Sequence, residues 1–261
     1  MEDNLTTNQQ IVRDFWETLP FAGYLVAVKM LKPGEADTLK DAKRPRLGNT
    51  LCQLIAQVHY LGRRHLVRMD DQVCYAPPYL FGTGELPVEA WKRYVGWQMK
   101  TEDAAKRTVE AASKFPQGLY EAIYMTPLER CSVAPDVVVF FGNASQMLVI
   151  VASYLADRGG ALPAEFSGMM SCGGLIIVPM LHGRPNIVLP GNPARILALP
   201  DRELGCGIPG SMMSELVANM QFMKANGGSQ YPPTWQIIQW PVQPPTSEML
   251  KPDGSPSWVK K

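Results

Sequence analysis

Val137-Val138-Val139-Phe140-Phe141 leads into the apolar stretch 147–155, and this order of segments repeats one that occurs earlier. In the earlier copy, Val26-Ala27-Val28-Lys29-Met30 precedes the apolar stretch 53–61. Both apolar stretches end in Tyr-Leu, and a cysteine follows each one, Cys74 and Cys172 respectively. β-Branched runs favour strands, and longer apolar stretches favour helices. The pattern predicts an internal duplication, over about residues 25–82 and 136–184, with a cleft between the halves that receives both cysteines.

The other segments predict a mixture of helices and strands. Helices are expected at 8–18, 50–61, 87–114 and 211–224, with Ser211 as the N-cap of the last. Strands are expected at 25–31, 122–125, 137–141, 175–178 and 186–189, the last two as a hairpin. We therefore expect an α/β fold, more narrowly α+β, as a single domain over residues 1–225 with a helical insertion between the copies.

Residues 226–261 differ in composition from the rest of the chain. They are rich in Pro, Gly, Ser and Gln, yet they contain Trp235, Trp240 and Trp258. A disordered tail rarely carries so many tryptophans. We expect an extended arm that packs on its own body or on a neighbouring subunit.

Composition and charge exclude some classes of function. A net charge of +1 provides no field that favours nucleic acid or an anionic membrane. The chain shows neither a signal peptide nor a run of membrane-spanning length. Five scattered cysteines without a CxxC pair favour thiols or metal ligands over disulfides, so we expect a cytoplasmic protein. Few charges beside 14 Met and 6 Trp suggest covered surface, and we expect a homo-oligomer.

The loop 142–146 lies between an expected strand and an expected helix. Its small residues leave backbone N–H groups open toward a ligand, which makes Asn143, Ser145 and Gln146 candidate cofactor-binding residues. The loop has neither the GxGxxG pattern nor the lysine of a phosphate-binding loop, so it carries no nucleotide specificity. An ordinary helix cap by Asn143 or Ser145 is the alternative.

Three cysteines are candidate site residues. Cys172 stands beside Gly173 and Gly174, which let a ligand approach the backbone, so Cys172 is a candidate nucleophile and Gly173 a candidate binding residue. Cys52, Cys74 and Cys172 are together candidate ligands of a soft metal ion or an iron–sulfur cluster, with one coordination position left open. Inert cysteines in the core are the alternative for all three.

Asn192 and Arg195 follow the turn signal Pro190-Gly191-Asn192-Pro193. An arginine can bind a carboxylate or a phosphate through two parallel hydrogen bonds. We treat Asn192 as a candidate binding residue and Arg195 as a candidate catalytic residue. The alternative is a turn shaped by Asn192 and a surface ion pair made by Arg195.

At these residues the chain resembles the family called domain of unknown function 169, over roughly residues 25–218. The resemblance rests on residues 135–146, Phe166-Ser167-Gly168 with Ser171-Cys172, the segment 189–195 and Gly207-Ile208-Pro209. Cys52-Gln53 and Cys74 also fit family positions. Members commonly have a further cysteine where this chain has Gly191. The resemblance implies that a four-cysteine site, if the family has one, lacks one ligand here.

These observations predict a protein that binds a small molecule or cofactor in a cleft between two related halves. It is expected to be an enzyme if the thiols act as nucleophile or as metal or iron–sulfur ligands. The alternative is a non-catalytic subunit whose methionine- and tryptophan-rich surfaces serve assembly.

Overall fold

One antiparallel sheet of six strands forms the centre of the computed structural model, which describes residues 2–39, 43–46, 48–85, 91–167, 170–190, 202–228 and 231. The strand order is β2-β3-β1-β4-β6-β5. The strands are β1 (Val26–Leu31), β2 (His65–Arg68), β3 (Ala122–Pro127), β4 (Val137–Gly142), β5 (Asn186–Val188) and β6 (Leu204–Pro209). Antiparallel strands combined with helices confirm the α+β prediction.

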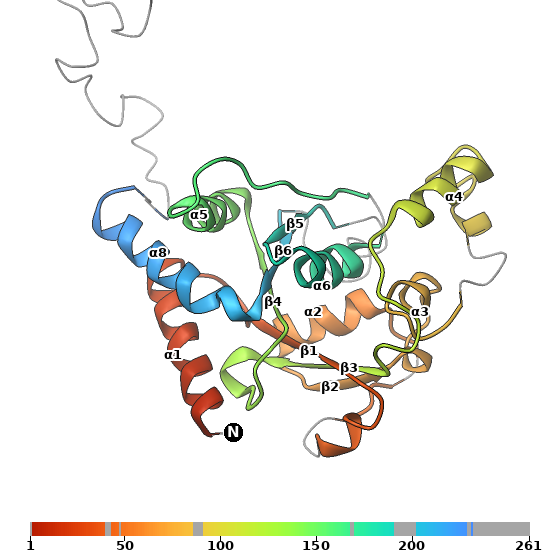
Figure 1. Cartoon of the computed structure of the whole chain (residues 1–261), viewed down its shortest axis with the longest axis horizontal. Coiled ribbons are helices and arrows are strands. Elements are labelled where there is room, and N and C mark those ends of the chain that lie inside the picture. Colours follow the sequence, from red (N-terminus) through yellow and green to blue (C-terminus); the bar gives the residue numbers. More distant parts are fainter. Residues whose placement is uncertain are drawn as a thin grey trace, which may run out of the picture.

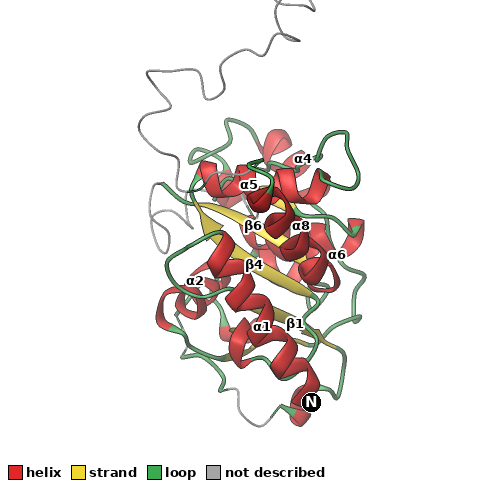
Figure 2. Ribbon diagram, turned by 90° about the vertical axis from the view of Figure 1, so that its left-hand side faces the viewer, coloured by secondary structure: helices red, strands yellow, loops and turns green. Residues whose placement is uncertain are grey.

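Helices cover both faces of the sheet, which lies between them in Figure 2. The helices are α1 (Glu2–Thr18), α2 (Leu51–Leu61), α3 (Ala76–Leu80), α4 (Glu102–Ala111), α5 (Ala144–Leu155), α6 (Ser171–His182) and α8 (Met213–Ala225). Side chains alternate between the two faces along each strand, so β4 buries Val137 and Val139 on one face and Val138 and Phe140 on the other. The first face, which we call the thiol face, packs against α2, α3 and α6. The second packs against α1, α5 and α8.

Helix α4 stands apart from both layers (Figure 1). It belongs to the segment between α3 and β3, together with the 3-10 helix at Trp91–Tyr94. Residues 87–114 were predicted as one long helix, and this prediction is wrong. Gly96 adopts a left-handed backbone (φ 79°) that interrupts the helix, and Thr101 then caps α4 by accepting a hydrogen bond from the N–H of Ala104.

The sheet consists of two halves of three strands with the same order. β1 and β4 form the central pair, and outward from each follow the third strand and then the second strand of its half. The ladder between the halves is symmetric about Ala27 and Val138, because Val26 pairs with Val139 and Val28 with Val137. An approximate two-fold axis therefore passes through the sheet between β1 and β4.

The register within each half agrees with this two-fold arrangement. Val28, Met125 and His65 lie side by side in the first half, and Val139, Gly207 and Asn186 lie side by side in the second. The boundaries 25–82 and 136–184 expected from the sequence are shorter than the two halves of the sheet, which extend to Pro127 and Pro209. The first half therefore includes one strand, β3, beyond the predicted boundary, and the second half includes two, β5 and β6.

The helix that corresponds to α2 in the second half is α6. Both lie on the thiol face. Both also end at a glycine with a left-handed backbone, Gly62 (φ 62°) and Gly183 (φ 59°), just before the edge strands that start at His65 and Asn186. The sequence pattern instead matched α2 with α5, which packs on the opposite face.

The strand predicted at 175–178 is wrong, because these residues lie within α6. A short apolar run does not distinguish a strand from a helix that is buried on several sides. The strand expected at 186–189 is present as β5, but its partner is β6 and not residues 175–178. The last helix was expected to start after Ser211, whereas Met212 occupies the N-cap position of α8 without a side-chain cap.

Most of the expected C-terminal arm lies outside the described residues. Tyr231 is described, and its hydroxyl accepts a hydrogen bond from the side-chain amide of Asn143 (3.1 Å). Among the described residues, the helices are each too short or too polar to cross a membrane.

Candidate functional site

Three cysteines from separate elements meet on the thiol face. Cys52 lies in the first turn of α2, Cys172 in the first turn of α6, and Cys74 just before α3. Cys172 is buried, whereas Cys52 and Cys74 are half-buried. Cys52 and Cys172 lie close enough for each thiol to shift the pKa of the other, and Cys74 lies close enough to interact with both electrostatically. The structure thus brings together the three cysteines that the sequence singled out.

Local hydrogen bonds fix the ends of the elements that carry two of these thiols. Thr50 caps α2 by accepting from the N–H of Gln53, whose side chain in turn accepts from the N–H of Thr50 (2.8 Å). Gln72 holds the segment before α3 with its side chain, which accepts from the N–H of Cys74 (2.7 Å) and donates to the Cys74 carbonyl (2.8 Å). The backbone beside Cys52 and Cys74 is therefore held in place.

The start of α6 is strained. Met170, which precedes Cys172 at the N-cap position, has φ 56° and ψ 39°, in the left-handed region that residues with a Cβ rarely adopt. It is the one non-glycine residue with positive φ within the described ranges. Such strain persists where the surrounding structure requires it, and it gathers at functional sites.

The thiol pair differs in its readiness to ionise. The Cys172 thiol lowers the pKa of Cys52 by hydrogen-bonding to its sulfur. The pKa of Cys172 is raised well above its usual range, first by that same hydrogen bond and then by burial. Burial raises the pKa of Cys74. A thiolate in this cluster therefore forms first at Cys52, while Cys172 keeps its proton.

Tyr94 completes the cluster. Burial, followed by the charges of the three cysteines, raises its pKa to about 12, so its hydroxyl remains protonated at neutral pH. Tyr94 lies in a segment predicted as a long helix, and nothing in its spacing marked it as a site residue. Its position follows from the turn that breaks this segment.

A cavity of about 520 Å³ adjoins the first turn of α6. It lies between this turn, α4 and the segment 165–167, and Gly173 and Gly174 form part of its wall. Gly173, a candidate binding residue from the sequence, therefore lies in the wall of a cavity. The thiol of Cys172 points away from the cavity wall into the core, where it is 3% exposed.

Glu165 lies in the wall of this cavity and is, like Tyr94, a residue that the sequence did not indicate. Its carboxylate accepts a hydrogen bond from the hydroxyl of Ser113 (3.0 Å) and pairs with His182 (3.2 Å) and Arg184 (3.9 Å). These partners come from segments far apart in the chain, so no local pattern could have grouped them. They tie the 165–167 segment to the end of α6.

Asn143, Ser145 and Gln146 do not join the cysteines. Asn143 and Gln146 cap α5 reciprocally, and Gln146 also donates to the carbonyl of Pro20 (2.7 Å), while Ser145 is exposed. They belong to the helix on the other face of the sheet. Asn192 and Arg195 lie outside the described residues, so the roles proposed for them stay predictions.

Within the described residues, His, Cys, Asp and Glu side chains nowhere gather as three or more potential ligands of one metal ion. Cys52, Cys74 and Cys172 are neighbours, but they do not converge as a coordination shell. The metal and iron–sulfur hypotheses therefore stay predictions from the sequence. The arrangement that the structure does contain is a close pair of thiols with a third nearby.

The chain belongs to the family called domain of unknown function 169, described as an uncharacterised ArCR family, whose model matches residues 15–219. This match confirms the resemblance seen in the sequence. The chain is also similar to the uncharacterised protein MJ0308 of Methanocaldococcus jannaschii, with 28% identity over 210 residues that cover 76% of this chain and 87% of that protein. No solved structure matches the chain.

Proposed function

We propose that this protein binds a small molecule next to a reactive thiol centre formed by Cys52, Cys74 and Cys172. The observation that carries the proposal is the meeting of three of the five cysteines, from three separate elements, beside a cavity. The two remaining cysteines, Cys131 and Cys206, are buried on the other face of the sheet.

In this proposal Cys52 is the nucleophile. Its pKa is lowered by the neighbouring thiol of Cys172, and thiolate is the form that attacks electrophiles. Cys172 acts as the hydrogen-bond donor that stabilises the thiolate, in place of the nucleophilic role expected from the sequence. The cavity beside Gly173 holds the rest of the molecule. An enzyme acting through a covalent thiol intermediate fits this arrangement.

Alkylation followed by peptide mass mapping tests the thiol assignment. Treatment of the native protein with iodoacetamide is expected to modify Cys52 first. Cys131 and Cys206 are matched controls, because burial raises the pKa of both thiols, that of Cys206 to about 12. Alkylation of Cys52 no faster than that of Cys206 would remove the basis of the proposal.

The cavity is tested separately. Denaturation of protein purified from cells, followed by mass spectrometry of the released small molecules, is expected to identify a retained compound. Gly173→Leu adds a side chain at the cavity wall, where a Cβ would lie 3.4 Å from the side chain of Leu80, and is expected to reduce the retained amount. Equal retention by both proteins would contradict binding in this cavity.

Elemental analysis of the same preparation tests the metal alternative. The proposal predicts less than one iron or zinc per chain after purification without chelators. A stoichiometric metal that is lost in Cys52→Ser and kept in Cys206→Ser would replace the nucleophile hypothesis with a metal centre. None of the five cysteines forms a disulfide, as is typical of proteins in a reducing compartment, and we propose that the protein is cytoplasmic.

A second candidate function is assembly with other copies of this chain. Three large apolar side chains are exposed on the helices of the other face: Trp16 by 54%, Leu148 by 67% and Phe222 by 63%. Single exposed apolar side chains are common on monomers, so the mass of the protein in solution decides whether its copies assemble. Light scattering after gel filtration is expected to give a dimer or larger. A monomeric mass would end this candidate.

A further inference from the structure

A basic pocket of about 410 Å³ lies at the outer edge of the first half, beside β2 and the end of α2. Five cationic side chains line it, and the described residues of its wall include no carboxylate. The cationic residues are Lys43, Arg44, Arg46, Arg63 and Arg64. Like charges at such short range repel one another unless an anion lies between them. The pocket is separate from the residues named in the proposed function.

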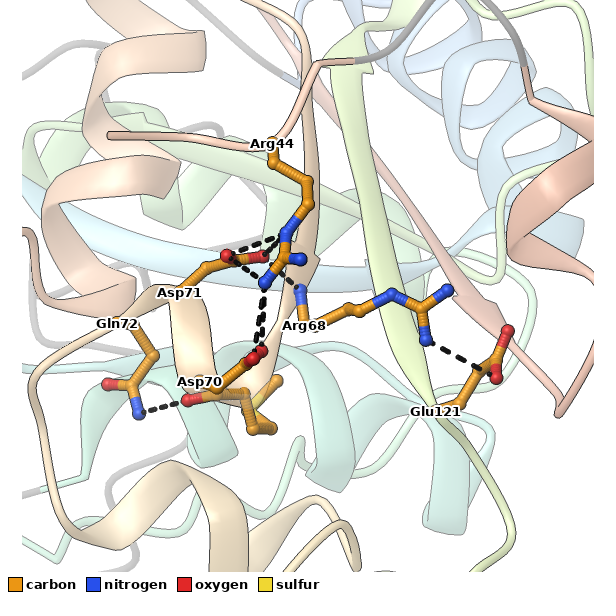
Figure 3. A network of polar contacts seen from close by, with 7 residues as sticks. Arg44, Arg68, Asp70, Asp71, Gln72 and Glu121 are labelled. Carbon is orange, nitrogen blue, oxygen red and sulfur yellow. Dashed lines mark hydrogen bonds and ion pairs between the residues drawn. The ribbon is translucent and has the colours of Figure 1, made fainter. Parts of the chain in front are cut away.

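One of these side chains holds the pocket together. Arg44 binds the buried carboxylate of Asp71 (Nε to Oδ1, 2.9 Å) and also reaches Asp70 (3.2 Å) (Figure 3). Asp71 accepts in addition from the N–H of Arg68 (2.8 Å), and the N–H of Leu66 donates to the carbonyl of Lys43 (3.1 Å). The segment 43–46 is therefore fixed alongside the edge strand β2.

This anchoring leaves other cations facing the pocket. Lys43, Arg46 and Arg63 are exposed, and none of them pairs with a carboxylate within the described residues. The guanidinium of Arg63 donates to the neutral side-chain amide of Gln57 (3.2 Å). The charges of these three side chains are thus not neutralised by a carboxylate of the described part of the chain.

His65 provides an independent sign of a ligand. Its side chain is 6% exposed and lines the pocket, and its Nε2 has no hydrogen-bond partner among the described residues. Buried polar atoms are nearly always satisfied, and one left without a partner destabilises the fold. A bound group that accepts or donates a hydrogen bond at Nε2 would remove this destabilisation.

The second half shows what fills the corresponding place. Asn186, the counterpart of His65, accepts from the N–H of Glu165 (2.9 Å) and donates to the carbonyl of Gly174 (3.0 Å). Arg184, at the position of Arg63 after the helix-ending glycine, has the Glu165 carboxylate at 3.9 Å. The second half supplies its own anion and satisfies its own polar groups. In the described part of the first half Arg44 has the carboxylates of Asp70 and Asp71, whereas the other exposed cations and the buried nitrogen have no carboxylate beside them.

We propose that the pocket binds the phosphate group of a phosphorylated small molecule. Arginine forks match phosphate oxygens in geometry, and several cations suit a group that carries more than one negative charge. In this assignment Arg63, Arg46 and Lys43 bind phosphate oxygens, and His65 Nε2 hydrogen-bonds the same group. Arg44 positions the segment and contributes no free charge.

Isothermal titration of the full-length protein with inorganic pyrophosphate at low ionic strength tests the proposal. The wild-type protein is expected to bind one equivalent, and Arg63→Gln is expected to weaken binding at least about tenfold. Arg63 is exposed, so this variant should fold, which circular dichroism checks. The matched control is Arg184→Gln, which removes the corresponding arginine of the second half and is expected to leave the affinity unchanged.

Three outcomes would overturn the proposal. They are the absence of pyrophosphate binding to the wild-type protein, equal affinity of wild-type and Arg63→Gln protein, and equal weakening by Arg184→Gln. An oligonucleotide that displaces pyrophosphate and binds more tightly, in an Arg63-dependent way, would replace the small molecule with nucleic acid. The thiol experiments remain independent, because no residue is shared between the two sites.

Discussion

The two halves of the sheet share strand order and register but differ in how their helices pack. In the second half α6 lies against the backbone of β6, where a Cβ on Gly207 would be 1.9 Å from the carbonyl oxygen of Leu175. In the first half the same place in the register is occupied by Met125, whose side chain separates α2 from β3. The second half is closed by direct contact between main chains, and the first is filled by side chains.

The two halves also differ in whether their buried polar groups have hydrogen-bond partners. Asn186 is fully buried and makes two hydrogen bonds, whereas His65 leaves Nε2 without a partner in the described part of the chain. The comparison suggests that the two halves have different roles. One copy of the repeat satisfies its own groups and provides rigidity, and the other keeps unsatisfied groups that are available to a ligand.

The largest expected effect comes from breaking the close contact of the second half. Gly207→Ala forces the added methyl against the Leu175 carbonyl and is expected to lower the free energy of unfolding by about 3 kcal/mol. Denaturant unfolding measures it. Gly228→Ala is the control, since its nearest atom would be 3.6 Å away. A loss below about 1 kcal/mol for Gly207→Ala would mean that the halves pack alike.

The pH dependence of stability tests whether His65 is kept neutral in the folded protein. Burial, followed by the charge of Arg63, lowers the pKa of His65 from 6.5 to about 4. The unfolded chain thus takes up the proton first, and stability contributed by neutral His65 is present above pH 6.5 and lost as the pH falls toward 4. The loss amounts to up to about 3 kcal/mol.

His65→Asn installs the residue of the other half and removes this titration. The difference in unfolding free energy between wild type and variant is therefore expected to change with pH between about 6.5 and 4. Other groups, His59 included, titrate in both proteins and cancel in the difference. Parallel stability curves across that range would show that His65 is not held neutral by its surroundings.

Asn186→Ala tests the second half, whose buried polar groups have hydrogen-bond partners. It leaves the N–H of Glu165 and the carbonyl of Gly174 without partners, and we expect a loss of about 2 kcal/mol in the free energy of unfolding. Asn226→Ala, at an exposed site, is the control and should change stability by less than about 0.5 kcal/mol. If both variants lose the same amount, Asn186 does not tie the second half together.

The smallest effect concerns the thiol pair, which joins the two halves. Cys172→Ala removes the donor that lowers the pKa of Cys52, so alkylation of Cys52 at neutral pH is expected to slow by about tenfold. Cys172→Ser keeps a hydroxyl donor and should retain part of the rate, and Cys206→Ala should retain all of it. Unchanged kinetics in Cys172→Ala would show that the two thiols act separately.

Much of the fold could be predicted from the sequence where local signals were strong. The strand at 137–141 and the helix at 50–61 are present because β-branched runs, Thr50 and Gly62 act locally. The prediction of a strand at 175–178 was wrong, because burial on several sides hides the helical period of these residues. A repeated pattern was predicted, but the helix of its second copy was matched by the Tyr-Leu ending rather than by the glycine that ends α2 and α6.

The site could be predicted only in part. Cysteines are rare and chemically distinctive, so Cys52, Cys74 and Cys172 could be grouped before their elements were placed. Tyr94, Glu165 and His65 carried no pattern, because their partners lie far away in the chain. The sequence pattern matched Cys74 with Cys172. Counted from the helix-ending glycines, Cys172 instead corresponds to Leu51, one residue before Cys52, so Cys74 is not its counterpart.

The pairing of β1 has a consequence for how the chain is made. Val26 pairs with Pro127 and Leu31 with Ala122 on one side, and Val28 pairs with Val137 on the other. A ribosome must therefore deliver about a hundred further residues before β1 has either neighbour. Until then its apolar residues and open hydrogen-bonding edges remain available to other nascent chains. Slow completion of the sheet, set by this long separation, is the step at which chaperones would matter most to this protein.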